Sequence, residues 1–184
     1  GRVVVDVEAV GLAFPDVLQC RGEYQVKPPL PFTPGSETAG RVSAVGDDVD
    51  SAILGRRVVA LGGGLAERLV LPASSVFEVP DVLASTKAAA VPMNYGTTWF
   101  ALHDRAHLAP GETLLVTGAA GGVGSAAIQL GKAAGAWVIA VAGGPEKVAA
   151  CTGLGADEVI DHREVDDLVA RVRELTDGNG VDVA

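Results

Sequence analysis

The chain has 184 residues, enough for one to one and a half ordinary domains with a hydrophobic core that needs no disulfide. Hydrophobic residues make up 48% of it, and 14 Lys and Arg against 23 Asp and Glu give a formal net charge of −9. This acidity disfavours binding to DNA, RNA or anionic lipid, and two distant cysteines, Cys20 and Cys151, exclude a disulfide scaffold and a four-cysteine zinc lobe. No signal-peptide pattern stands at the start, so we expect a cytoplasmic protein.

Residues 1–92 contain short β-forming segments. We expect strands at 3–7, 40–46, 57–61 and 67–71, the last of them preceded by a turn at Gly62–Gly64. Four prolines between residues 28 and 34 exclude regular structure there, because each lacks an N–H and fixes φ. Short strands separated by Gly and Pro are typical of a small β-barrel or sandwich.

From about Pro92 the pattern changes to alternating helices and strands. A helix is expected at 97–108, then strands at 113–117, 137–141, 158–160 and 181–183, separated by helices at 123–134, 145–151 and 165–175. This order predicts a parallel sheet with right-handed crossovers. The uncharged segment 113–131 is long enough for a membrane helix, but its five glycines favour a buried strand, a turn and a buried helix.

A glycine-rich segment links the first of these strands to its helix. Ala119-Ala120-Gly121-Gly122-Val123-Gly124 fits the dinucleotide-binding fingerprint, with Ala at its first position. Gly121 would let the backbone approach a pyrophosphate, Gly124 would let the helix lie close to the strand, and the helix N-terminus would offer N–H groups to the phosphates. A plain tight turn is the alternative, but the position between a predicted strand and a predicted helix favours a cofactor.

The same residues also resemble the short-chain dehydrogenase pattern, as Thr117-Gly118-x-x-x-Gly122-x-Gly124. Those enzymes place the loop almost at the N-terminus and use a Tyr-x-x-x-Lys pair. Here about 110 residues precede the loop, and neither Tyr24 nor Tyr95 has a Lys four positions later. We therefore reject this interpretation.

The end of the second strand in this half of the chain favours NADPH over NADH. NAD-binding proteins usually place an acid there to hold the ribose 2′-hydroxyl, whereas residues 142–144 are Ala-Gly-Gly. Gly143 leaves space for a 2′-phosphate, and Lys147 offers it a positive charge. The alternative for Lys147 is a solvated helix residue beside Glu146.

Several segments together resemble the medium-chain dehydrogenase/reductases. The stretch Phe14-Pro15-Asp16-Val17-Leu18 with Gly22-x-Tyr24 is similar to their active-site strand. Further similar segments are Pro31-Phe32-x-Pro34-Gly35-Ser36-Glu37-x-Ala39-Gly40-x-Val42, Gly55-x-Arg57-Val58, Gly64-x-Ala66-Glu67, Gly111 to Gly124, and Gly153-x-Gly155-Ala156-Asp157-x-Val159-Ile160. They cover nearly the whole chain in order, and the nearest branch is the zinc-independent quinone oxidoreductases, similar to zeta-crystallin.

The resemblance implies an α/β protein with a GroES-like β-barrel substrate domain at 1–92. The first half of an NADP-binding Rossmann domain, a doubly wound parallel sheet, would follow at 93–184. The substrate would bind in the cleft between the two domains. Because the chain begins and ends inside predicted strands, we expect it to be truncated at both ends relative to a longer protein.

The resemblance also bears on metals. Zinc alcohol dehydrogenases have Cys where this chain has Ala13, and Gly-His-Glu where it has Gly35-Ser36-Glu37. Only Glu37 remains, and one carboxylate cannot build a tetrahedral site, so no metal is expected. The segment His103-Asp104-Arg105-Ala106-His107 resembles His-Glu-x-x-His but lacks a visible third ligand, so we interpret its histidines as surface residues.

In activity, the resemblance implies hydride transfer from NADPH to a quinone, or to an enone or enoyl thioester. Tyr24 is the candidate proton or hydrogen-bond donor, because relatives place this tyrosine in the cleft. Asp16, Asn94, Tyr95 and Thr98 are candidates for shaping the site, Thr98 on the cofactor side. For each of them core packing or a turn is the alternative, and for Tyr95 this alternative has at least equal weight. Relatives often have a tyrosine near the adenosine 2′-phosphate at the position of His162-Arg163. His162 or Arg163 is therefore a candidate for contacting that phosphate. The alternative, with equal weight, is that both residues belong to a loop that binds no ligand.

Two other functions stay open. The chain could belong to a non-catalytic NADPH-binding structural or adaptor protein, or to the enoyl reductase module of a larger synthase. The family commonly has Asn where this chain has Ala13, which removes an amide from the expected cleft. The expected partners are a small-molecule substrate and a second copy in a homodimer, with no nucleic acid and no membrane.

Overall fold

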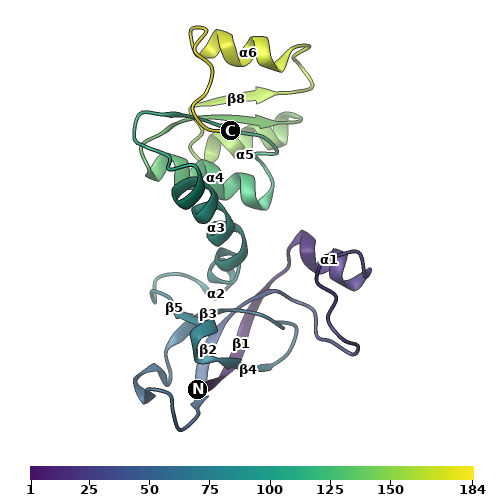
Figure 1. Cartoon of the computed structure of the whole chain (residues 1–184), viewed down its shortest axis with the longest axis vertical. Helices are drawn as coiled ribbons and strands as arrows, with labels where there is room; N and C mark the ends of the chain where they lie inside the picture. The colour runs from purple at the N-terminus through teal and green to yellow at the C-terminus, as the bar shows by residue number, and fades with distance from the viewer. The chain divides into compact units, whose positions relative to one another are not determined.

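The computed structural model describes all residues, Gly1–Ala184, and they form two compact units, Gly1–Met93 and Asn94–Ala184. Figure 1 colours the first unit from purple to teal and the second from teal to yellow. Helix α3 (Val91–Trp99) contains the division between them.

The first unit contains one antiparallel sheet with the strand order β4-β1-β2-β3-β5. Its strands are β1 (Arg2–Gly11), β2 (Glu37–Val45), β3 (Arg57–Leu61), β4 (Arg68–Pro72) and β5 (Val76–Glu78). Val3, Val5, Val42 and Val58 are buried in one cluster, and Ala39 and Val59 are buried in a second one with Ala88 and Ala89. The predicted strands are confirmed, although the outer strands β4 and β5 do not pair to close a barrel.

Two details of this sheet differ from the predictions. Strand β1 continues past the predicted Val7 to Gly11, with a register shift between Val7 and Ala9 where Glu8 interrupts the apolar run. Strand β5 was not predicted, because three residues are too few to show an alternation. Short 3₁₀ turns, η1 (Ser51–Ile53) and η2 (Ala73–Ser75), and helix α2 (Ser85–Ala88) complete the unit.

The segment similar to an active-site strand is a helix, α1 (Phe14–Cys20), so the strand assignment was wrong. Pro15 stands in the first helical turn, where its missing N–H costs nothing. The Asp16 carboxylate accepts a hydrogen bond from the Ala13 N–H at 2.7 Å and closes that turn. The stretch that follows, up to Ser36, has no helix or strand, which confirms the prediction for residues 28–34.

The second unit contains a parallel sheet with the order β6-β7-β8. The strands are β6 (Thr113–Val116), β7 (Trp137–Ala142) and β8 (Glu158–Asp161), and the helices are α4 (Gly122–Ala133), α5 (Pro145–Gly153) and α6 (Leu168–Leu175). The alternation of strands and helices predicted from the sequence is confirmed.

Three predicted boundaries were wrong in this unit. The helix expected from Thr97 begins at Val91 as α3 and continues as a π-helix, η3 (Phe100–Arg105). Helix α6 begins at Leu168 rather than 165, because the Asp167 side chain caps it by accepting from the Ala170 N–H. The fourth strand is a single parallel bridge between Val183 and Leu114, on the side of β6 away from β7.

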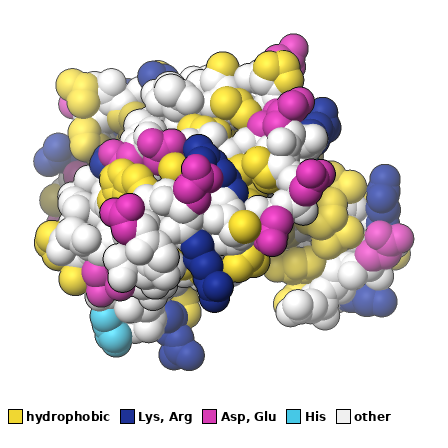
Figure 2. Space-filling view, turned by 90° about the horizontal axis from the view of Figure 1, so that it is seen from above, with side chains coloured by type: hydrophobic (Ala, Val, Ile, Leu, Met, Phe, Trp, Pro, Cys, Tyr) yellow, Lys and Arg dark blue, Asp and Glu magenta, His cyan; other side chains and the backbone are white.

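The surface shown in Figure 2 mixes side chains of all kinds. Lys and Arg are scattered there among acidic and hydrophobic side chains. Throughout the chain, no helix has the length and apolar character needed to cross a membrane.

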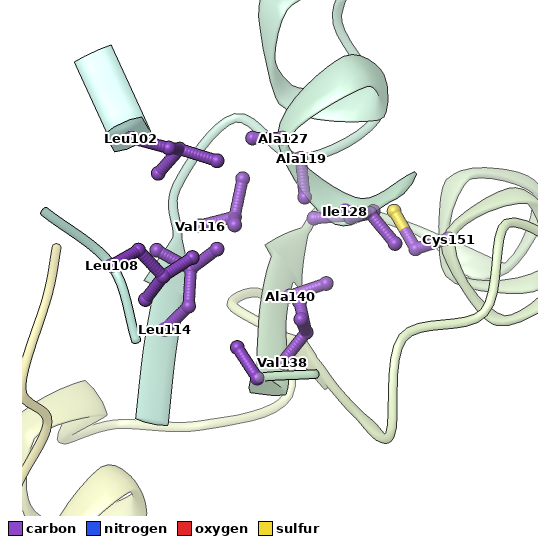
Figure 3. Close-up of a cluster of buried hydrophobic side chains, with 12 residues drawn as sticks. Leu102, Leu108, Leu114, Val116, Ala119, Ala127, Ile128, Val138, Ala140 and Cys151 are labelled. Carbon is purple, nitrogen blue, oxygen red and sulfur yellow. The ribbon is translucent and has the colours of Figure 1, made fainter. Parts of the chain in front are cut away.

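The core of the second unit covers both faces of the sheet, which explains why its strands are apolar without alternation. Leu114, Val116, Val138 and Ala140 pack with α4 and with Cys151 of α5 (Figure 3). On the opposite face, Leu115, Ile139, Val141 and Ile160 pack with α6. Figure 1 accordingly shows α4 and α6 on opposite sides of the sheet.

Candidate dinucleotide-binding site

The glycine-rich loop runs from the end of β6 into α4. Gly118 adopts a left-handed φ of 59°, and its carbonyl accepts from the Gly121 N–H at 2.9 Å. The Ala119 N–H donates to the Val141 carbonyl at 3.1 Å and ties the loop to β7. Gly121 is the N-cap of α4 and provides no side-chain cap. The first N–H groups of this twelve-residue helix are therefore directed at whatever lies before its N-terminus.

Two glycines at the start of α4 lie in close contact with their neighbours. A Cβ atom at Gly124 would lie 2.5 Å from the Gly118 oxygen and 2.7 Å from the Ala119 Cα. One at Gly122 would lie 2.5 Å from the Asn94 Oδ1 atom. At Gly124 the obstructing atoms are backbone, so the helix can lie against its own loop only with glycine there, as the fingerprint requires. At Gly122 the neighbouring atoms belong to the Asn94 side chain, which a larger residue would displace.

Three predicted site residues of α3 lie along the first turns of α4. Asn94 lies against Gly122, as above. The buried Thr98 hydroxyl donates to the Asn94 carbonyl at 2.7 Å and lies 3.3 Å from the Val123 carbonyl. The Tyr95 hydroxyl accepts from the Gln129 Nε2 at 2.7 Å. The structure thus brings Asn94 and Thr98 to the glycine loop and gives Tyr95 a partner on α4.

Two adjoining cavities open at the carboxyl ends of the parallel strands. The first, of about 470 Å³, is lined by Gly118, Gly121, Gly143, Lys147 and His162, together with Thr117, Ala120, Val141, Ala142 and Leu168. The second, of about 340 Å³, is lined by Gly143, Gly144, Pro145, Glu146, Lys147 and Arg163. The glycine loop and the predicted phosphate-binding residues therefore share one edge of the sheet, where ligands of open α/β sheets bind.

Asp161 organises the turn around Gly143. Its carboxylate accepts from the Gly144 N–H at 2.9 Å and from the Arg163 N–H at 3.0 Å. These two hydrogen bonds lower the pKa of Asp161 below its ordinary value, and the one from Arg163 has the larger effect. A Cβ atom at Gly143 would lie 2.5 Å from the His162 Nε2 and 3.1 Å from the Arg163 Nε, so these side chains lie over the glycine.

Sequence reasoning assigned no role to Asp161, Thr117 or Leu168. The available signal for Asp161 was an acid at the carboxyl end of a predicted strand, one strand beyond the usual position for the ribose-binding acid. Thr117 and Leu168 carried no sequence signal, because they line the first cavity only through the way the loop after β6 and the start of α6 come together.

The remaining predicted site residues belong to the first unit. Asp16 is 4% exposed, and its carboxylate accepts from the Ala13 N–H and the Ser36 hydroxyl. Tyr24 is half-buried in the stretch after α1, and its hydroxyl has no hydrogen-bond partner within the chain. Asp16 therefore has a clear structural role, whereas the hydroxyl of Tyr24 remains available to a ligand.

Glu37, next to Ser36 in the sequence, is fully buried, and its carboxylate accepts a hydrogen bond from the Met93 N–H at 2.9 Å. Burial raises the pKa of Glu37, the Met93 hydrogen bond opposes that rise, and the charge of Asp16 adds to it. No group of three or more His, Cys, Asp and Glu side chains is arranged to hold a metal ion.

Comparisons with known proteins agree with this arrangement. The family of alcohol dehydrogenase GroES-like domains matches residues 1–81, and the family of zinc-binding dehydrogenases matches residues 122–184. A quinone oxidoreductase-like protein 2 homolog of Nematostella vectensis is 42% identical over 186 residues, covering 99% of this chain and 50% of the relative. Erythronolide synthase EryA2 of Saccharopolyspora erythraea is 44% identical over 186 residues, covering 100% of this chain and 5% of the synthase.

Among solved structures, the quinone oxidoreductase of Thermus thermophilus, whose crystal structures include a complex with NADPH, is similar in fold. Its TM-score is 0.82 at 39% identity, with 96% of this chain and 55% of that chain covered. The chain spans about half the length of the quinone oxidoreductase-like relatives it matches. With both family matches in chain order around the glycine loop, the chain belongs to the medium-chain dehydrogenase/reductase superfamily, in its quinone oxidoreductase branch.

Proposed function

We propose that the full-length protein containing this chain is an NADPH-dependent reductase that works without zinc. Its acceptor would be a quinone or an α,β-unsaturated carbonyl compound, including enoyl thioesters. The observation that carries this proposal is the common sheet edge at which the glycine loop and the cavity-lining Lys147 and Arg163 meet. The NADPH complex of the Thermus thermophilus relative supports the choice of cofactor.

The residues at this edge fit a phosphorylated dinucleotide. The N-terminus of α4 at Gly121 would hold the pyrophosphate through backbone N–H groups. Lys147 and Arg163, with His162 beside them, would hold the 2′-phosphate. Glu146 also lines the smaller cavity, and the Asp161 carboxylate lies behind it on the Gly144 and Arg163 N–H groups, so the two cations there are balanced by two nearby acids.

The chemistry assigns two further tasks to the protein. NADPH supplies the hydride when it is bound, and the reduced acceptor is an enolate or a hydroquinone anion. That anion needs a hydrogen-bond donor or a proton, and we assign this role to the Tyr24 hydroxyl. Asn94 and Thr98, held against α4 by the contacts described above, would shape the cofactor side of the site. Asp16 would act on the same site only indirectly, by fixing α1.

The proposal is tested by screening acceptors with the full-length protein. We expect NADPH consumption with simple quinones or with a crotonyl thioester, and slower consumption of NADH at equal concentration. Tight NADPH binding without turnover on any acceptor would instead identify a non-catalytic NADPH-binding protein. Failure to bind either nucleotide would overturn the proposal altogether.

A second candidate is an enoyl reductase module within a larger synthase. The match to EryA2 favours it, because this chain corresponds to 5% of that synthase at 44% identity. The sequence flanking the chain, and a preference for enoyl thioesters over quinones in the same screen, would support this candidate. Flanking sequence that ends shortly after a complete Rossmann domain would exclude it.

We further propose that the full-length protein is a cytoplasmic homodimer. The assembly is tested by analytical ultracentrifugation, in which a single species with twice the subunit mass is expected. A monomer over the accessible concentration range would contradict it.

A further inference from the structure

Asp161 connects two turns that are distant in sequence. It is the last residue of β8 and pairs with Ala142, the last residue of β7. One carboxylate oxygen accepts from the N–H of Gly144, in the turn that starts α5, and the other from the N–H of Arg163, in the turn that follows β8. Gly144 has a left-handed φ of 92°, which favours glycine, and a Cβ atom there would lie 3.0 Å from the Arg163 Nη1 atom.

The two connected turns carry the basic side chains of the smaller cavity. Lys147 lies in α5, just after the turn that contains Gly144. Arg163 lies in the other turn, the one that follows β8. Both line the same cavity, together with Gly143 and Gly144. The separation of these two cations therefore depends on how the turns are held together, and Asp161 is the side chain that holds them.

We propose that Asp161 is a positioning residue for cofactor choice, whose carboxylate holds Lys147 and Arg163 in place to bind the 2′-phosphate of NADPH. This inference rests on the proposed NADPH site. It differs from two simpler roles that an acid in this position could have. A carboxylate acting only through its charge would repel the phosphate, and a carboxylate acting on the ribose 2′-hydroxyl would favour NADH.

These roles predict effects of opposite sign for Asp161→Asn. The substitution removes a negative charge and replaces one acceptor oxygen by an NH₂ group, which cannot accept from either backbone N–H. If Asp161 positions the turns, NADPH affinity falls about tenfold, as expected when a charge-assisted contact is weakened, while NADH affinity changes less than about twofold. If only its charge matters, NADPH affinity rises. If it binds the ribose, NADH affinity falls at least as much as NADPH affinity.

The test measures dissociation constants of both nucleotides for the full-length protein by fluorescence titration. Asp166→Asn is the matched control, because Asp166 is exposed in the same loop and has no hydrogen bond or ion pair. It removes the same charge and should leave the NADPH-to-NADH affinity ratio within about twofold, because solvent screens the charge of an exposed side chain. An unchanged ratio in Asp161→Asn, or either of the opposite effects, overturns the inference.

A second variant and a measurement on the parent protein also test the role of Asp161. Asp161→Ser, which keeps one acceptor, should lower NADPH affinity in the same direction and serves if Asp161→Asn does not fold. In the parent protein, hydrogen exchange should show the Gly144 and Arg163 amides protected despite their position in surface turns, and fast exchange of both overturns the inference. If the parent protein binds neither nucleotide, the proposed function fails before this inference is tested.

Discussion

At the scale of single residues, the cavity beside Gly143 is lined by two cations from different turns, Lys147 and Arg163. A charge-assisted hydrogen bond to phosphate contributes about 1.5–3 kcal/mol to binding. Because two cations would contact the same phosphate, we expect the contribution of each to lie at the lower end of this range. We expect Lys147→Ala to weaken NADPH binding about tenfold with little change for NADH. Competitive titration of the two nucleotides measures this.

The control for that substitution is Lys87→Ala, which removes an exposed lysine of the first unit without an ion-pair partner. It should leave both affinities unchanged. An unaltered NADPH-to-NADH ratio in Lys147→Ala would show that the 2′-phosphate is held elsewhere.

Tyr24 is the residue on which the proposed chemistry depends. Its hydroxyl has no partner within the chain, so Tyr24→Phe should disturb the fold little. Loss of a proton donor lowers turnover by about a hundredfold or more, and NADPH affinity should stay within about twofold of the parent, because Tyr24 is assigned to the acceptor. Steady-state kinetics with the best acceptor and NADPH titration measure the two effects. Unimpaired turnover in Tyr24→Phe would mean that solvent or another group supplies the proton.

At the scale of elements, the contact between α4 and its own loop depends on Gly124. A methyl group there would lie 2.5 Å from the Gly118 oxygen, and backbone on both sides leaves little room to relax. We expect Gly124→Ala to destabilise the protein by about 1–3 kcal/mol, as overpacking does, and to weaken NADPH binding by displacing the loop. Urea unfolding and nucleotide titration measure both effects.

Gly153→Ala provides the comparison for that variant. Gly153 lies at the end of α5, and a Cβ atom there would meet nothing within 4 Å. This substitution should be neutral or stabilise by up to about 1 kcal/mol, because alanine has less freedom in the unfolded chain. Equal behaviour of the two alanine variants would refute the close-packing argument.

The end of α4 is joined by an ion pair to Asp157, the residue before β8. The Lys132 ammonium lies 2.7 and 2.8 Å from the two Asp157 oxygens, one of which also accepts from the Val138 N–H. Burial alone would raise the pKa of Asp157, but the hydrogen bonds from Lys132 and Val138, together with the Lys132 charge, lower it below its ordinary value. The folded state therefore favours the ionised carboxylate.

This sign determines the pH dependence of stability. Because the folded-state pKa is depressed, the stabilisation is fully present above about pH 4 and disappears as the pH falls through the folded-state value. We expect Asp157→Asn to cost about 1–2 kcal/mol near neutral pH, since the partly exposed pair is screened by solvent, and much less at about pH 3. Urea unfolding at several pH values tests this. Asp104→Asn, at an exposed aspartate without a partner, should show no such dependence, and a pH-independent cost of Asp157→Asn would contradict the prediction.

At the scale of the whole molecule, the absence of zinc is the clearest prediction. Ser36 donates its hydroxyl hydrogen bond to Asp16, and the Glu37 carboxylate accepts from the Met93 N–H, so both are already used within the fold. Ala13 offers no ligand atom. We therefore expect elemental analysis of the full-length protein, purified without chelators, to find far less than one zinc per chain. Stoichiometric zinc that survives dialysis would show that other ligands complete a site.

The order of strands and helices in the second unit was predictable from sequence because it depends on local signals. Continuous apolar runs mark strands that are covered on both faces, and Gly121 and Gly124 mark a turn where backbone and helix approach closely. Where several local signals compete, the prediction failed. The 14–18 segment resembled a strand, but Pro15 and Asp16 close a helical turn there.

The convergence of residues at the sheet edge was decided only by the tertiary structure. Asp161 meets Gly144 because the register of β7 and β8 sets Ala142 opposite Asp161. Asn94 lies over Gly122 because α3 packs on α4. Hydrogen bonds between positions 17 or more apart depend on strand register and helix packing, which no local pattern encodes. The sequence by itself therefore determined the fold and the phosphate loop, whereas the partners of each site residue followed from how the elements pack.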